Sequence, residues 1–89
     1  MSGRHFRAFC YARQESAGPR IGLTVPRAVG KAVVRNRIKR RMREAIRRQL
    51  RLLDPKWDVV FNPRISVRDA PFAELEREVR RVFERCNAS

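Results

Sequence analysis

Residues 31–51 combine a dense positive charge with apolar side chains at helical spacing. Ten lysines and arginines stand there against one acid, Glu44, so this stretch supplies nine of the thirteen net positive charges of the chain. A folded protein tolerates such self-repulsion when a negatively charged partner neutralises it. A polyanion is therefore the expected partner.

The apolar residues of this stretch predict a helix over residues 31–53. At about 100° per residue, an arc of roughly 120° collects the core-facing side chains, which are Val34, Ile38, Met42, Ala45, Ile46, Gln49, Leu52 and Leu53. Glu44 is placed to pair with Arg40 and Arg48, one turn away on either side. The rest of the circumference is basic and consists of Arg37, Lys39, Arg40, Arg41, Arg43, Arg47, Arg48 and Arg51.

The length of 89 residues predicts one domain over residues 1–89. A net charge of +13 and a pI of about 11.7 favour nucleic acid as the partner, with an anionic membrane surface as the other candidate. The membrane is disfavoured because the apolar arc has no aromatic anchor. No apolar run approaches the roughly 20 residues of a membrane span, and no signal peptide is recognisable, so we expect a cytoplasmic protein.

Two strands are expected before the basic helix. Residues 5–13 alternate, with Phe6, Ala8, Cys10 and Ala12 on one face and Arg7, Phe9, Tyr11 and Arg13 on the other. A polar turn over residues 14–19 leads to a second strand at residues 20–25, and we expect the two strands to form an antiparallel hairpin. His5 is expected at the surface.

A third strand and a second helix are expected after the basic helix. Residues 57–61 are nearly all apolar, which predicts an inner strand with Trp57 and Phe61 in the core. From Pro71 onward, apolar side chains recur every three or four residues to Cys86, and the charges of this helix balance. Cys10 and Cys86 show no zinc or disulfide spacing, so we interpret them as small buried apolar residues.

The phrase Arg35-Asn36-Arg37-Ile38-Lys39-Arg40, continued by Arg43-Glu44, resembles the signature of the protein subunit of bacterial ribonuclease P. Three neighbouring segments also resemble that family: the strand at residues 20–25, the start of the basic helix at residues 30–34 and the strand at residues 57–61. The resemblance implies a two-layer α/β (α+β) sandwich, in which the basic helix is the crossover of a left-handed βαβ unit in a sheet of three or four strands. Members usually begin with a basic helix ahead of the first strand, and we expect that helix to be missing here.

The resemblance also implies a function. The protein would bind the catalytic ribonuclease P RNA and the 5′ leader of precursor tRNA, while the RNA and its Mg²⁺ ions perform the hydrolysis. The residues expected to contact the RNA subunit are Lys31, Arg35, Asn36, Arg37, Lys39, Arg40, Arg43 and Arg47. Arg7, Phe9, Tyr11 and Arg13 are candidates for the leader, because aromatic rings stack on unpaired bases, although such aromatics also pack under helices.

A protein-based nuclease is not indicated by the residues. Asp54, Asp58 and Asp69 lie on separate connections, and the lone histidine has no obvious partners, so we predict no catalytic residue and no metal site in the chain. No obligate protein partner is predicted. The alternative function is a small ribosomal or general RNA-binding protein without an enzymatic role.

Overall fold

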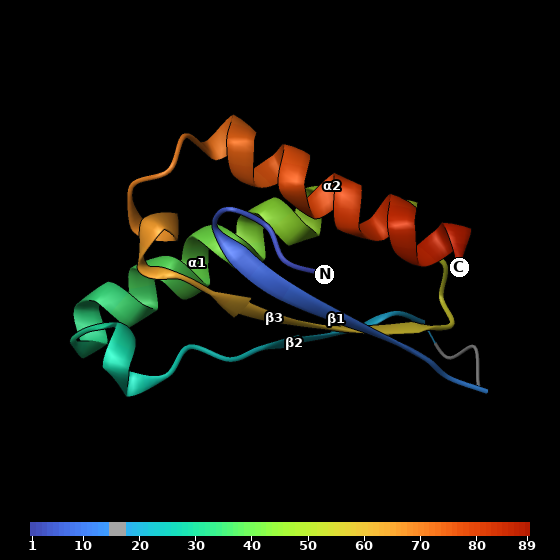
Figure 1. The fold of residues 1–89 in the computed structure, drawn as a ribbon, viewed down its shortest axis with the longest axis horizontal. Helices are drawn as coiled ribbons and strands as arrows, with labels where there is room; N and C mark the ends of the chain where they lie inside the picture. Colours follow the sequence, from blue (N-terminus) through green and yellow to red (C-terminus); the bar gives the residue numbers. More distant parts are fainter. Residues whose placement is uncertain (15–17) are drawn as a thin grey trace.

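The structure is a computed structural model that describes residues 1–14 and 18–89. Both helices lie on one side of the sheet, which gives one helix layer and one strand layer (Figure 1). The strands are β1 (Phe6–Ala12), β2 (Arg20–Leu23) and β3 (Trp57–Pro63), and the helices are α1 (Ala32–Gln49) and α2 (Phe72–Ala88). Short 3-10 helices lie in the connections, namely η1 (Arg27–Val29), η2 (Leu50–Leu52) and η3 (Ile65–Arg68). The predicted two-layer sandwich is confirmed.

The central strand is β3. It pairs antiparallel with β1 and parallel with β2, so the strand order is β1-β3-β2. The expected hairpin between the first two strands is therefore wrong, because the most apolar strand lies between them and is covered on both edges. The turn predicted at residues 14–19 includes residues 15–17, which lie outside the described part of the chain.

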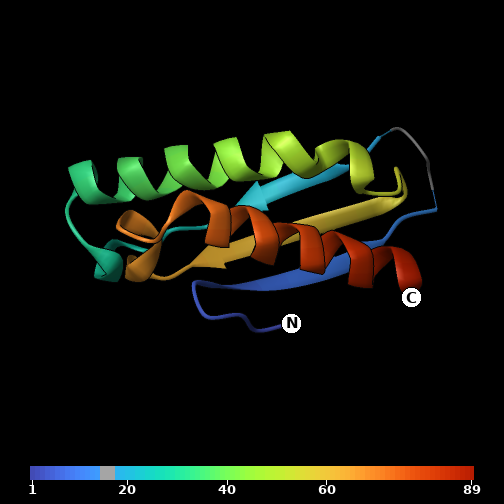
Figure 2. The same cartoon turned by 90° about the horizontal axis from the view of Figure 1, so that it is seen from above.

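The β2-α1-β3 crossover is left-handed. In Figure 2 the helix layer faces the reader, and β2 and β3 both point to the left with β3 below β2. When the strands are set upright with the helices in front, the chain moves leftward from β2 to β3. Nearly all parallel crossovers are right-handed. The left-handed crossover that the resemblance implied is therefore unusual, and the observed direction of the chain confirms it.

The core lies between the helix layer and the sheet. The apolar arc of α1 buries Ile38, Met42, Ala45 and Ile46 as predicted, and Trp57 and Phe61 are buried as expected. The Phe61 ring meets the Phe6 and Phe83 rings edge to face, at centroid distances of 5.2 and 6.2 Å. Leu52 departs from the predicted arc and is 39% exposed, because the chain tightens into η2 after Gln49 and the helical phase changes.

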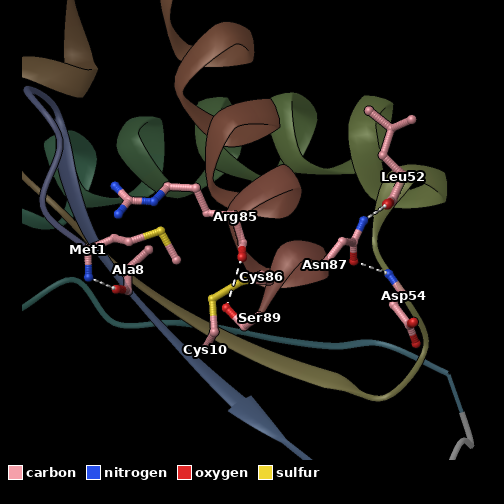
Figure 3. The surroundings of a disulfide bond; sticks show 9 residues. All are labelled: Met1, Ala8, Cys10, Leu52, Asp54, Arg85, Cys86, Asn87 and Ser89. Atoms are coloured by element: carbon pink, nitrogen blue, oxygen red, sulfur yellow. Dashed lines mark hydrogen bonds between the residues drawn. A yellow bond between two sulfur atoms is a disulfide. The ribbon is translucent and has the colours of Figure 1, made fainter.

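The interpretation of the two cysteines as separate apolar residues is wrong. Cys10 and Cys86 are joined by a disulfide, with their Cα atoms 6.3 Å apart (Figure 3). Cys86 is buried in the last turns of α2, which pass over the strand that carries Cys10. The two residues are 76 positions apart, so the tertiary fold brings them together and no local spacing could have indicated the pair.

The surface position expected for His5 is also wrong. His5 is only 4% exposed, since β1 begins beneath the first turns of α2. Its Nδ1 lies 2.8 Å from Ser66 Oγ, and its Nε2 lies 2.8 Å from Glu74 Oε2 and 3.6 Å from Glu78 Oε2. His5 therefore connects β1, η3 and α2 through one ring.

Candidate nucleic-acid interface

The outer face of α1 gathers most of the residues predicted to contact RNA. A shallow hollow of about 400 Å³ is lined by Asn36, Lys39, Arg40, Arg43, Glu44 and Arg47. Five of these six are predicted contact residues. The other three predicted residues, Lys31, Arg35 and Arg37, lie toward the N-terminal end of the helix and outside this hollow. Because the core-facing arc fixes the rotation of α1, the basic side chains that line this hollow point away from the core as one surface.

Glu44 is the one acid in this surface. It accepts a hydrogen bond of 2.6 Å from Arg47 and one of 3.3 Å from Arg48. The pairing with Arg48 was predicted, whereas Arg47 takes the place expected for Arg40. The hydrogen bond from Arg47, together with the charges of both arginines, lowers the pKa of the Glu44 carboxyl below its usual value, although desolvation acts in the opposite direction. Glu44 thus stays ionised and holds these two guanidinium groups in place.

Arg41 has a structural role that the sequence interpretation missed. It was counted among the outward cations, yet it is only partly exposed and donates to three carbonyl oxygens, those of Val67 (2.7 Å), Arg68 (3.0 Å) and Ala70 (2.6 Å). Arg37 Nε donates to the same Arg68 carbonyl at 3.1 Å. The end of η3 is therefore held to α1 by arginine side chains, and Arg41 is not available for an outside partner.

Arg35 lies at the margin of the apolar arc and is half-buried. Its Nε atom is buried and has no hydrogen-bond acceptor among residues 1–14 and 18–89. This position agrees with packing of the aliphatic part of the Arg35 side chain against the core.

The opposite side of the sheet carries the second group of candidates. Phe6 and Ala8 are buried toward the helices, so Arg7, Phe9 and Tyr11 project from the other face of β1. Tyr11 is 57% exposed, and the Arg7 guanidinium lies 5.8 Å from the centroid of the half-buried Phe9 ring. The structure thus brings three of the four leader candidates onto one open face.

Arg13, the fourth leader candidate, lies just beyond β1 and is occupied within the protein. Its Nε lies 2.9 Å from Asp58 Oδ1, and its terminal nitrogen donates to the Pro55 carbonyl at 2.9 Å and to the Gly18 carbonyl. These contacts fix the end of the strand.

The open face also includes residues that sequence reasoning missed. In the observed register, Val60 lies between Phe9 and Gly22, and Asp58 lies between Tyr11 and Arg20. Arg20 therefore joins the aromatic surface from β2. Its alternation with Ile21 was visible in the sequence, but the expected hairpin placed the strands in the wrong order.

Chemically, these two surfaces can bind anions and stack bases. In the part of the chain that the structure describes, no three His, Cys, Asp or Glu side chains are grouped as a metal site requires. Among the same residues, no helix is long and apolar enough to cross a bilayer.

Comparisons with known proteins agree in naming one family. The family model described as Ribonuclease P matches residues 1–87. The Ribonuclease P protein component of Mycobacterium avium is 40% identical over 84 residues, which cover 94% of this chain and 71% of that protein. The component of Clostridioides difficile is 33% identical over 78 residues, which cover 86% of this chain and 68% of that protein. The chain spans between 39% and 72% of the length of the curated relatives it matches.

A solved structure supports the same fold. The RNase P protein from Thermotoga maritima superposes with a TM-score of 0.82 at 25% identity, covering 96% of this chain and 80% of that one.

Proposed function

The chain belongs to the ribonuclease P protein family, and we propose that it acts as the protein component of ribonuclease P, the endoribonuclease that removes the 5′ leader of precursor tRNA. The observation that carries this proposal is the cationic outer face of α1, where five of the eight predicted RNA contacts line one hollow. The names of the relatives favour this function over that of a general RNA-binding protein.

The α1 surface is proposed to dock on the catalytic RNA. Arginine guanidinium groups bridge phosphates in a planar, bidentate way, and such contacts supply affinity that falls as salt rises. They fix the position of the protein with little sequence information. A folded RNA with a fixed arrangement of phosphates is the partner that this surface suits.

The open sheet face is proposed to hold the single-stranded leader. Phe9 and Tyr11 offer rings on which unpaired bases stack, and Arg7 and Arg20 flank them with positive charge. Arg13 supports this surface by fixing the end of β1 through Asp58. Because the helices cover the other side of the sheet (Figure 1), the leader on the open face and the catalytic RNA on α1 would occupy different sides of the protein.

Mg²⁺ belongs to the RNA in this proposal. Among the described residues no three His, Cys, Asp or Glu side chains are placed so that they could hold an ion, and we route no chemical step through a protein-held one. The contribution of the protein is to neutralise phosphate charge and to position the substrate. A cytoplasmic location goes with this role, because precursor tRNA is processed there.

Reconstitution tests the proposal. Combined with the ribonuclease P RNA of Mycobacterium avium, the chain should support cleavage of a precursor tRNA at a Mg²⁺ concentration too low for the RNA alone. Arg40→Ala on α1 should weaken this effect, while Arg81→Ala on α2, where charges balance, should not. Cleavage by the protein without RNA, or no effect on the RNA at any Mg²⁺ concentration, would refute the function.

A further inference from the structure

A groove of about 430 Å³ runs between the free edge of β2 and the side of α1. Figure 2 shows why it exists: α1 lies alongside β2 at the rim of the sheet, and no further strand of the described chain covers that edge. The groove has an apolar floor and a basic rim, formed by Ile21, Leu23, Ile46, Leu50, Arg43 and Arg47. Its volume lies within the range of small-ligand sites.

The floor offers flat apolar contact beside backbone hydrogen-bonding groups. Ile21 and Leu23 face the helix layer, because their partners in the register are the buried Val59 and Phe61. The amide of Thr24 donates to the Phe61 carbonyl, and in a parallel ladder alternate residues bond to the same neighbour. Ile21 and Leu23 therefore direct their backbone N–H and C=O groups outward, along the free edge.

The rim is continuous with the phosphate-binding surface of α1. Arg43 and Arg47, one helical turn apart, line both this groove and the basic hollow described above. Arg47 is held by Glu44, whereas Arg43 has no carboxylate partner in the described residues. A phosphate bound at Arg43 would place its nucleotide at the entrance of the groove.

We propose that this groove receives one unstacked nucleobase of the RNA that docks on α1. This inference rests on the proposed function and goes beyond it, because it assigns a base-binding site to the β2 edge. A nucleotide matches all three features at once: its base has apolar faces for Leu23 and Leu50, a polar edge for the strand backbone, and a phosphate for Arg43. An acidic peptide would match the rim, but β2 has only four residues for strand pairing.

Photocrosslinking tests the site directly. Ribonuclease P RNA of Mycobacterium avium, transcribed with 4-thiouridine, is bound to the full chain, irradiated and digested with trypsin. Cleavage after Arg20 and Arg27 releases residues 21–27 as one peptide, so a nucleotide adduct on Ile21 or Leu23 can be located by mass spectrometry. We expect that adduct. Crosslinks found only on α1 peptides that lie outside the groove would overturn the proposal.

Binding measurements supply an independent test. Leu23→Ala should weaken RNA binding by about 4- to 60-fold, the range expected when one to three buried carbon groups lose their contact with the base, without changing the salt dependence. Arg43→Ala should instead reduce the slope of log affinity against log salt by about one. Leu52→Ala, an exposed leucine next to but outside the groove, is the matched control and should bind like the parent.

The outcomes separate this inference from the proposed function. If the parent binds the RNA and a folded Leu23→Ala chain binds equally well, the base site is wrong while the function stands. If the parent does not bind the RNA, the proposed function itself fails. Thermal melting establishes whether Leu23→Ala is folded, and the crosslinking result decides the question where that variant is not.

Discussion

Cys10 on β1 and Cys86 near the end of α2 are bonded to each other across 76 residues of sequence. The bond connects the sheet to the helix layer at the end of the molecule where α2 terminates (Figure 3). Asn87, the next residue, accepts a hydrogen bond from the amide of Asp54 and donates to the carbonyl of Leu52. The C-terminal turn of α2 is thus held covalently to β1 and by hydrogen bonds to the segment that precedes β3.

Reduction of this disulfide should destabilise the fold. A covalent link across so long a loop restricts the unfolded chain, and the usual gain is about 2–4 kcal/mol, with long loops at the upper end. We expect dithiothreitol to lower the free energy of unfolding, measured by urea titration, by that amount. The Cys10→Ala/Cys86→Ala double variant is the control and should not respond to the reductant. An equal response of parent and variant would contradict the prediction.

Stability should fall with acid because of Glu74. The hydrogen bond from His5, with smaller contributions from Arg4, His5 and Arg77 charges, lowers the pKa of this carboxyl in the folded chain. A lowered folded pKa gives stability that is full above the unfolded pKa and is lost as pH falls through the folded pKa. Urea midpoints measured from about pH 7 to about pH 3 should therefore decline less in Glu74→Gln than in the parent.

The matched control for that experiment is Glu84→Gln. Glu84 lies exposed on α2 and forms no ion pair among the described residues, so its removal should leave the acid decline as steep as in the parent. An identical decline in all three proteins would rule out a contribution from Glu74.

Arg41 and Arg40 are neighbours on α1, but their substitutions should have different effects. Arg41→Ala should lower stability, and Arg40→Ala should weaken RNA binding. Arg41→Ala removes three hydrogen bonds to carbonyls near η3, and hydrogen bonds from a charged donor typically contribute about 1.5–3 kcal/mol. We expect a loss of that order in the free energy of unfolding. Arg40→Ala, on the exposed face, should change it by less than about 0.5 kcal/mol yet weaken RNA binding. Equal stability of the two variants would be evidence against this assignment.

Tyr11 should contribute to leader recognition alone. Tyr11→Ala removes an exposed ring from the open sheet face, and a lost base stack costs about 1–3 kcal/mol. The affinity of the assembled enzyme for precursor tRNA should fall accordingly, while its affinity for mature tRNA and that of the protein for the catalytic RNA stay unchanged. Val33→Ala, which removes another exposed apolar side chain, should leave all three affinities as they are.

Local patterns predicted the helices and the central strand, because those features follow from periodicity. The arc of Ile38, Met42 and Ile46 fixed which side of α1 is basic, and the apolar run from Trp57 indicated an inner strand. The family motif that begins at Arg35 then indicated that α1 is the crossover of a left-handed βαβ unit.

The remaining features depend on contacts between residues far apart in the chain. The burial of His5 depends on η3 and α2, and the role of Arg41 depends on carbonyls about 26 residues later. The Cys10–Cys86 bond and the place of Arg20 depend on a strand order that alternation along a single strand does not encode. The sequence shows the type of each of these residues but not the residues that it contacts.

The placement of the two candidate surfaces on different sides of the protein has an electrostatic consequence for the proposed function. Two RNA strands bound to neighbouring patches of one face would repel each other strongly. In the proposed complex the sheet would lie between the leader and the RNA on α1, and packed layers are spaced by about 10 Å. The Debye length at physiological ionic strength is about 8 Å. Salt would therefore screen much of the repulsion between the two polyanions.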